Sequence, residues 1–140
     1  MSVALSVRLP EAISESLDAY AVERSLNRST VVTRALDEWI RLQSHPGIRF
    51  MTSPTGDRVA ALERGPEVWT VAEAWVTLDP ACRSVDEVAH ITGLTVVEVE
   101  TALRYYADFQ EEIDAELARM WQAQKEEQAA WERLRGASVH

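Results

Sequence analysis

Apolar and polar residues alternate over a short stretch near the start of the chain, and a proline closes this stretch. Leu5, Val7 and Leu9 are apolar and the residues between them are polar or small, which is the period-2 pattern of a strand with one apolar face. Pro10 ends the strand and suits the first turn of a helix, because the amide that proline lacks would go unpaired there. A strand this short cannot bury its apolar face alone. The sequence therefore predicts pairing with the same strand of a second copy, as an antiparallel ribbon.

The polar side of such a ribbon would be open to a nucleic acid. A two-stranded ribbon fits the DNA major groove, where side chains reach the base edges. The residues expected to contact DNA from this face are Ala4, Ser6 and Arg8. The alternative is that the strand and the helices after it form only a dimerisation core.

Two short helices are predicted to follow the strand. Over residues 11–25 the apolar side chains recur at spacings of three or four, which is typical of an amphipathic helix. Ser29 is a natural N-cap for a second helix, which is predicted to run to about Leu42. Free amides at the start of this helix, beside a basic side chain, suit a DNA phosphate. The candidate phosphate-binding residues are Arg28, Ser29 and Thr30.

Residues 6–40, with their VRLP junction and their NRST helix start, resemble a ribbon-helix-helix DNA-binding domain. Domains of this kind occur in many bacterial repressors and antitoxins. The resemblance covers roughly residues 1–43 and implies an obligate, intertwined dimer. It also implies that Ser6 and Arg8 read bases, while the residues at the start of the second helix hold backbone phosphates.

The chain carries a net charge of −9, which is unusual for a protein that binds DNA. The charge is unevenly distributed: residues 1–43 have five basic and six acidic groups, whereas residues 44–140 have nine basic and seventeen acidic groups. The second part is therefore expected to do something other than hold DNA. The sequence has no apolar run long enough to span a membrane and no leader pattern, so a cytoplasmic protein is expected.

Residues 44–108 are predicted to form a small domain that begins with a β-hairpin. Two apolar runs, residues 48–51 and 59–62, flank a cluster of turn-forming residues, which is the pattern of a hairpin. A helix is expected between Glu67 and Asp79. Its apolar residues occupy much of the circumference, which indicates burial on more than one side.

A helix-turn-helix pattern follows in the same domain. Ala89, Gly93 and Val99 have its spacing, in which the alanine lets two helices approach, the glycine makes the turn and the valine packs underneath. Ser84, with a glutamate three residues later, forms a capping box for the first helix, and Thr95 can cap the second. The exposed positions of the second helix are mostly acidic, so the sequence favours a structural or protein-binding role over DNA recognition.

Residues 45–116 resemble a small winged-helix-like domain that recurs in bacterial antitoxins. The most specific part is the run GLTVVEVETALRYYADFQEEID. Antitoxins of this kind often occur beside toxins with a PIN-type or PIN-like ribonuclease fold. The resemblance therefore implies a toxin of that class as the partner.

Residues 109–140 are predicted to form a C-terminal helix and a short tail. A thin apolar stripe runs along residues 109–135, and Gly136 is expected to end the helix. Trp121 and Trp131 indicate a partner-binding helix, because aromatic side chains are common interface anchors. The expected partner-binding residues are Ile113, Leu117, Arg119, Trp121, Trp131, Arg133 and Leu134. The alternative is a solvated helix whose stripe packs on the preceding domain.

The sequence contains no catalytic or metal-binding pattern. His45, His90 and His140 are scattered, and the single cysteine, Cys82, excludes a disulfide within one chain. The chain has neither a Gly-rich phosphate loop nor a nucleophile elbow. We therefore expect no enzymatic activity, no metal and no cofactor.

The fold expected overall is mainly α. It consists of an N-terminal ribbon-helix-helix (β-α-α, an intertwined dimer), a small winged helix-turn-helix-like domain and a C-terminal helix. The expected function is that of the antitoxin of a type II toxin–antitoxin system, which represses its own operon as a homodimer on operator DNA and neutralises a PIN-like ribonuclease. Two alternatives stay open. One is a stand-alone ribbon-helix-helix transcriptional regulator with a ligand-sensing or assembly domain, and the other is a purely structural dimer.

Overall fold

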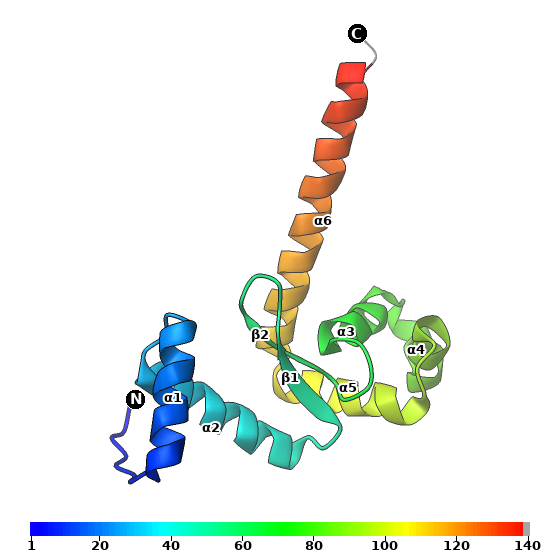
Figure 1. Cartoon of the computed structure of the whole chain (residues 1–140). Helices are drawn as coiled ribbons and strands as arrows, with labels where there is room; N and C mark the ends of the chain where they lie inside the picture. The colour runs from blue at the N-terminus through cyan, green and yellow to red at the C-terminus, as the bar shows by residue number, and fades with distance from the viewer. Residues whose placement is uncertain (139–140) are drawn as a thin grey trace. The chain divides into compact units, whose positions relative to one another are not determined.

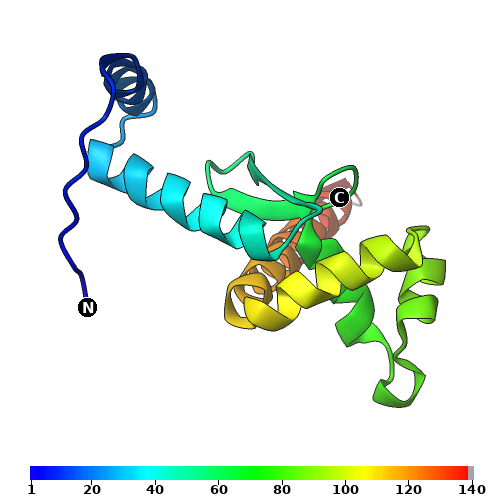
Figure 2. The ribbon, with the colours of Figure 1, turned by 90° about the horizontal axis from the view of Figure 1, so that it is seen from below.

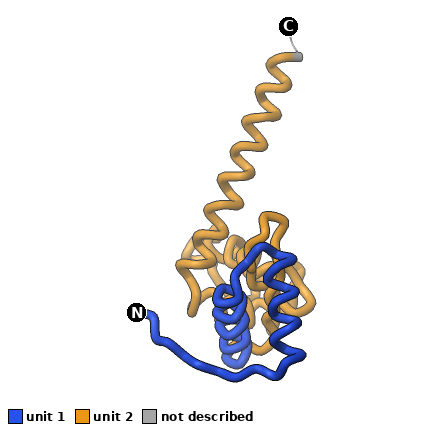
Figure 3. Tube along the Cα trace, turned by 60° about the vertical axis from the view of Figure 1, so that its left-hand side comes forward, with its two compact units in different colours: residues 1–44 blue, residues 45–140 orange. Residues whose placement is uncertain are grey.

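The computed structural model describes residues 1–138, which form helices and one β-hairpin (Figure 1). The chain divides into two compact units, unit 1 (residues 1–44) and unit 2 (residues 45–140), which are coloured separately in Figure 3. None of the described helices combines the length and the apolar composition that a membrane span requires.

Unit 1 contains two helices, α1 (Glu11–Glu23) and α2 (Arg28–Ser44), after ten residues without regular secondary structure. The prediction of an N-terminal strand, and with it of a β-α-α ribbon-helix-helix fold, is wrong. The two strands of the described chain come after both helices and pair with each other. A strand needs hydrogen-bond partners, and within the described chain no segment pairs with residues 1–10.

The connection between α1 and α2 is closed by backbone hydrogen bonds. The amides of Ser25 and Leu26 donate to the carbonyl oxygens of Val22 and Ala21, at 3.2 and 2.9 Å. This pattern is a Schellman motif with Ser25 in the left-handed region, at a φ of 56°. The first helix therefore ends two residues earlier than the sequence predicts.

Asn27 caps α2, and the predicted N-cap at Ser29 is wrong. The side-chain oxygen of Asn27 accepts a hydrogen bond from the amide of Thr30 at 2.7 Å. Ser29 lies inside the first turn of the helix, which begins at Arg28. Asparagine and serine are comparable as caps, so the spacing of the sequence alone could not decide between them.

Unit 2 begins with the predicted β-hairpin, which is confirmed. Its strands β1 (Ile48–Thr52) and β2 (Arg58–Leu62) are antiparallel, with Ile48 opposite Leu62. Four of the five residues of β2 are buried, so this strand forms part of the core of unit 2.

Three helices follow the hairpin, and their packing makes the rest of the core. They are α3 (Val68–Thr77), α4 (Val85–Thr92) and α5 (Val96–Asp108), with a short 3-10 helix, η1 (Pro80–Cys82), between α3 and α4. Figure 2 shows α4 and α5 meeting at their turn. The side chains of Val71, Val88 and Val99, one from each helix, are fully buried.

The predicted turn at Gly93 is confirmed. Gly93 has a φ of 73°, and its amide donates to the carbonyl oxygen of Ala89 at 2.9 Å. The complete capping box lies at Thr95 and Glu98, whose side chains each accept the other residue's amide at 3.1 Å. At Ser84 one of the two hydrogen bonds of a capping box is present: the amide of Glu87 donates to Ser84 Oγ at 3.0 Å.

The described part of the chain ends in one long helix, α6 (Gln110–Ser138), which stands at a steep angle to α5 (Figure 1). Its first turns pack on α3 and α5, and Ile113 and Leu117 are buried there. The prediction that Gly136 ends the helix is wrong, because α6 continues through Ser138. Glycine lowers helix stability by about 1 kcal/mol relative to alanine, which one position in a long helix tolerates.

Candidate interaction surfaces

The three residues predicted to read DNA bases lie in the N-terminal segment, residues 1–10. Ala4, Ser6 and Arg8 are all exposed. The apolar residues that alternate with them are exposed as well, at 78% for Leu5 and 68% for Val7. Both the polar and the apolar series of this segment are therefore open to a partner.

The candidate phosphate-binding residues lie at the start of α2. The guanidinium Nε of Arg28 is 3.1 Å from a carboxylate oxygen of Asp18, and another of its nitrogens donates to Ser14 Oγ at 3.3 Å. The side chains of the ion pair are 57% and 54% exposed, so the pair contributes little to stability. Arg28 could therefore exchange its carboxylate for a phosphate at little cost.

The other two candidates differ in what they can offer. Ser29 is exposed, whereas Thr30 is half-buried and its amide already donates to Asn27. An amide engaged in the helix cap is not available to a phosphate. Arg28, Ser29 and the side-chain hydroxyl of Thr30 thus remain the candidates at this helix start.

One face of α2 is apolar and exposed. Its residues have the i, i+4, i+7, i+8 spacing of a single helix face, which is typical of the side that a helix buries. They are Val32, Leu36, Trp39 and Ile40, with exposed fractions of 38%, 48%, 62% and 59%. In unit 1, all of whose residues the structure describes, only Ala21 is buried. So small a unit rarely folds on its own core, so this face, here called the α2 apolar face, is a candidate interaction surface.

The predicted partner-binding residues of α6 fall into two groups. Ile113 and Leu117 are 0% and 3% exposed, so they anchor α6 to unit 2 and cannot contact a partner. Trp121 is 40% exposed, and its indole N–H donates to Glu73 of α3 at 2.6 Å. The other predicted residues are exposed as well: Arg119, Trp131, Arg133 and Leu134.

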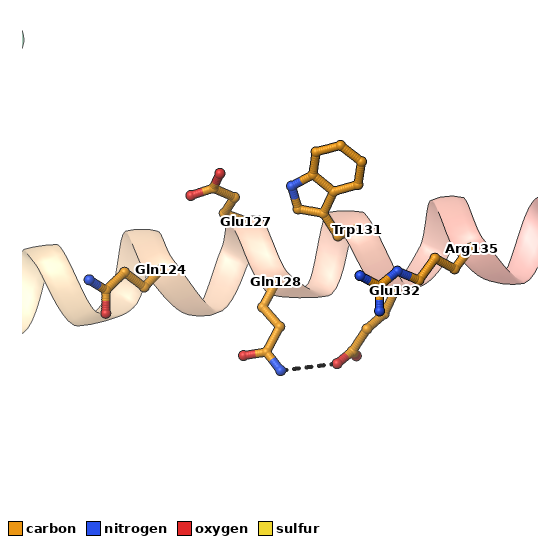
Figure 4. Close-up of a pocket in the computed structure, with 6 residues that line it drawn as sticks. All are labelled: Gln124, Glu127, Gln128, Trp131, Glu132 and Arg135. Atoms are coloured by element: carbon orange, nitrogen blue, oxygen red, sulfur yellow. Dashed lines mark hydrogen bonds between the residues drawn. The ribbon is translucent and has the colours of Figure 1, made fainter.

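Trp131 lies beside a shallow hollow on the exposed part of α6 (Figure 4). The hollow has a volume of about 410 Å³ and is lined by Gln124, Glu127, Gln128, Trp131, Glu132 and Arg135. Figure 4 shows the side chains of Glu127 and Trp131 on the same side of the helix. All six residues belong to one helix, so the hollow is an open part of the helix surface and not an enclosed pocket.

Two tyrosines of α5 hold the beginning of α6. The hydroxyl of Tyr105 donates to Glu112 at 3.2 Å, and that of Tyr106 donates to Asp114 at 2.6 Å. Burial and the hydrogen bond to Asp114 raise the pKa of Tyr106 to about 12. The elbow between α5 and α6 is therefore fixed by polar contacts as well as by packing.

Glu116 is a buried carboxyl that sequence reasoning missed. It belongs to an acidic stretch of the sequence, residues 111–116, yet it is 5% exposed, and its Oε2 has no hydrogen-bond partner among the described residues. Burial, followed by the negative charge of Glu112, raises its pKa to about 7, against the opposing effect of Arg119. The apolar residues that flank it, Ile113 and Leu117, are the signal that could have revealed its burial.

Among the described residues, no group of three or more His, Cys, Asp or Glu side chains could hold a metal ion. Comparison with known protein families, with curated proteins and with solved structures finds no match to this chain. Its functional assignment therefore rests on its own residues.

Proposed function

We propose that this protein is the antitoxin of a type II toxin–antitoxin system. In this proposal it acts in the cytoplasm, represses its operon as a homodimer on operator DNA, and neutralises a PIN-like ribonuclease. The observation that carries the proposal is the presence of two separate exposed partner surfaces on one chain, the α2 apolar face in unit 1 and the distal part of α6 in unit 2. A protein that must hold both a second copy and a toxin needs two such surfaces.

Unit 1 supports the DNA-binding half of the proposal. Its α2 apolar face would be covered by a second copy, and dimers bind operators through two half-sites. Arg8 and Arg28 are exposed on this unit, whose residues 1–43 have a net charge of only −1. Most of the excess of acidic groups belongs to residues 44–140, so the charge of unit 1 itself opposes DNA only weakly.

The distal part of α6 supports the toxin-binding half. Residues 118–137 carry four basic and three acidic groups, whereas residues 110–117 carry four acidic groups and no basic one. A PIN-like ribonuclease is expected to have a cluster of metal-binding carboxylates, which attracts cations. Trp131, at 55% exposed, would supply the apolar anchor beside the basic side chains.

Growth rescue tests the proposal. Truncation after Trp121 keeps the anchors Ile113 and Leu117, so unit 2 should remain folded. In this proposal a PIN-like ribonuclease is encoded beside the gene. The full chain should restore growth to cells that express it, and the truncated chain should not. Both should bind operator DNA with similar affinity in a mobility-shift assay. Rescue by the truncated chain at matched expression would remove α6 from toxin binding, and failure of the full chain to rescue would end the antitoxin assignment.

A stand-alone regulator that senses a ligand is the second candidate. It is favoured by a hollow of about 360 Å³ in unit 2, lined in part by Trp75, Arg83 and Tyr106. The guanidinium of Arg83 already donates to the carbonyl oxygens of Trp75 and Val76 at 3.0 Å, so it has little capacity left for an anion. Operator binding without any growth rescue would favour this candidate.

A further inference from the structure

Residues 118–137 of α6 form an exposed helix about 30 Å long. Every side chain in this range is exposed except that of Ala129, which is half-buried. Two hydrogen bonds of 3.2 Å, from Gln122 to Glu126 and from Gln128 to Glu132, run along the helix and support it.

A single seam connects the buried and the exposed parts of α6. The residues that form it alternate at spacings of four and three, which is the heptad spacing of paired helices. They are Ile113, Leu117, Met120, Gln124, Glu127, Trp131 and Leu134. The first two pack in unit 2, and the last four continue the same line into solvent. The seam thus extends beyond the body that it packs against.

We propose that the exposed part of this seam pairs with α6 of a second copy of the chain, in antiparallel orientation. In a parallel pair each seam residue faces its own counterpart, so Glu127 would face Glu127 and two carboxylates would be buried together. In an antiparallel pair centred on Ala129, Glu127 lies opposite Trp131 of the other copy. Its carboxylate then accepts the indole N–H, and the like charges are separated.

The same antiparallel register also gives favourable contacts to the residues on either side of the Glu127–Trp131 pair. Gln124 lies opposite Leu134, and Trp121 comes close to Arg135 of the other copy, where a guanidinium can rest on the indole face. Along one flank every seventh residue is small, so the two backbones can approach closely. These residues are Ala123, Ala130 and Ala137. Charge and shape therefore both select the antiparallel pair.

The self-pairing would cover Trp131, which the proposed function assigns to the toxin. A second copy and the toxin would then compete for one surface. This competition alone rests on the proposed function, because the pairing itself needs no toxin.

Energy transfer between labelled copies of the full chain tests the pairing and its direction, without any toxin. With Cys82→Ser to remove the native thiol, one sample carries a donor at Gln122→Cys and a second carries an acceptor at Gly136→Cys. Both sites point away from the seam, and the antiparallel register places them at the same level of the pair. A donor and an acceptor both at Gly136→Cys would lie about 20 Å apart along the axis.

Transfer should be more efficient for the mixed 122/136 pair than for the 136/136 pair. Trp131→Ala should raise the concentration of half-maximal transfer at least tenfold. Glu127→Leu should retain transfer, because an apolar side chain also fits against the indole, and the outward-facing control Glu126→Leu should leave it unchanged. The reverse order of efficiencies, or transfer that Trp131→Ala does not alter, would overturn the proposal. The energy-transfer result does not depend on growth rescue by the full chain. The helix pairing can therefore be wrong while the antitoxin function is right, and the reverse.

Discussion

The imidazole Nε2 of His45 lies 2.8 Å from a carboxylate oxygen of Asp108, so the first residue of unit 2 is tied to the last residue of α5. The ring is buried and packs edge-on against Tyr105 and Phe109, at centroid separations of 5.1 and 5.7 Å. His45, which belongs to no recognisable pattern in the sequence, therefore helps to fix the junction between α5 and α6.

His45→Ala should lower the free energy of unfolding of unit 2 by about 1–3 kcal/mol. The substitution removes a buried ring from an aromatic cluster and leaves Asp108 without its nitrogen partner. Chemical denaturation of the full chain, followed by tryptophan fluorescence, measures the effect. His90→Ala is the matched control, because His90 is exposed and should change stability little. Equal losses at the two positions would contradict the structural role of His45.

Glu116 should make stability depend on pH. Its pKa is about 7 in the folded chain and 4.5 as its ordinary value, so the folded state binds the proton more tightly. The stabilising effect of protonation is fully present below about pH 4.5 and is lost as the pH rises through about 7. The loss amounts to roughly 3 kcal/mol at most, given about 1.4 kcal/mol for each pKa unit. The charges that act on this carboxyl come from Glu112 and Arg119 on α6, Glu67 before α3 and Asp57 in the hairpin turn.

The variant Glu116→Gln tests this dependence. It should be more stable than the parent at pH 8 and should lose that advantage near pH 5, as measured by denaturation at both values. Glu111→Gln changes an exposed position on the same helix, so its stability should equal that of the parent at both pH values. A constant difference between Glu116→Gln and the parent across this range would show that Glu116 does not titrate as described.

Short-range sequence patterns were sufficient to predict most of the secondary structure of unit 2. The cap at Thr95, the turn at Gly93 and the hairpin depend on residues within a few positions of one another, and the structure forms them where the sequence places them. Burial depends on distant parts of the chain. His45 is buried by residues some sixty positions away, and the elbow that encloses it leaves no periodic mark in the sequence.

The prediction of an N-terminal strand failed for a related reason. Its alternation correctly identifies one polar and one apolar series, but a strand is defined by backbone partners that the sequence pattern does not contain. The helical spacing of the α2 apolar face shows that its residues share one side of the helix, yet that side is exposed. Periodicity identifies which residues share a face, and it does not identify what covers that face.

Ser25→Gly should stabilise unit 1 by about 0.5–1 kcal/mol. Ser25 has a φ of 56°, a conformation that glycine adopts without the steric penalty of a side chain. Amide hydrogen exchange of peptides from residues 11–44 should slow in this variant. Ser29→Gly is the control, because Ser29 lies in the first turn of α2, where glycine should speed exchange. Faster exchange in Ser25→Gly would mean that its side chain makes a stabilising contact.

Arg8→Ala should reduce discrimination between operator and random DNA. An arginine that reads a base commonly contributes about 1–3 kcal/mol of discrimination, because it pairs with guanine in the major groove. Binding to both DNAs is measured by fluorescence anisotropy. Arg64→Ala, in unit 2, should leave both affinities unchanged. If Arg8→Ala retains the operator preference of the parent, Arg8 does not read bases.

Arg28→Ala should weaken binding to operator and random DNA to a similar extent, because a phosphate contact carries no sequence information. The slope of the logarithm of affinity against that of salt concentration should fall by about one unit. The exposed ion pair with Asp18 adds a second, opposite expectation. Asp18→Asn releases the guanidinium and removes a negative charge close to the DNA, so it should strengthen binding to both DNAs. In the double variant with Arg28→Ala, the part of this gain that acts through Arg28 should disappear. Identical gains from Asp18→Asn with and without Arg28 would show that the carboxylate acts on DNA directly and that Arg28 is not the phosphate ligand.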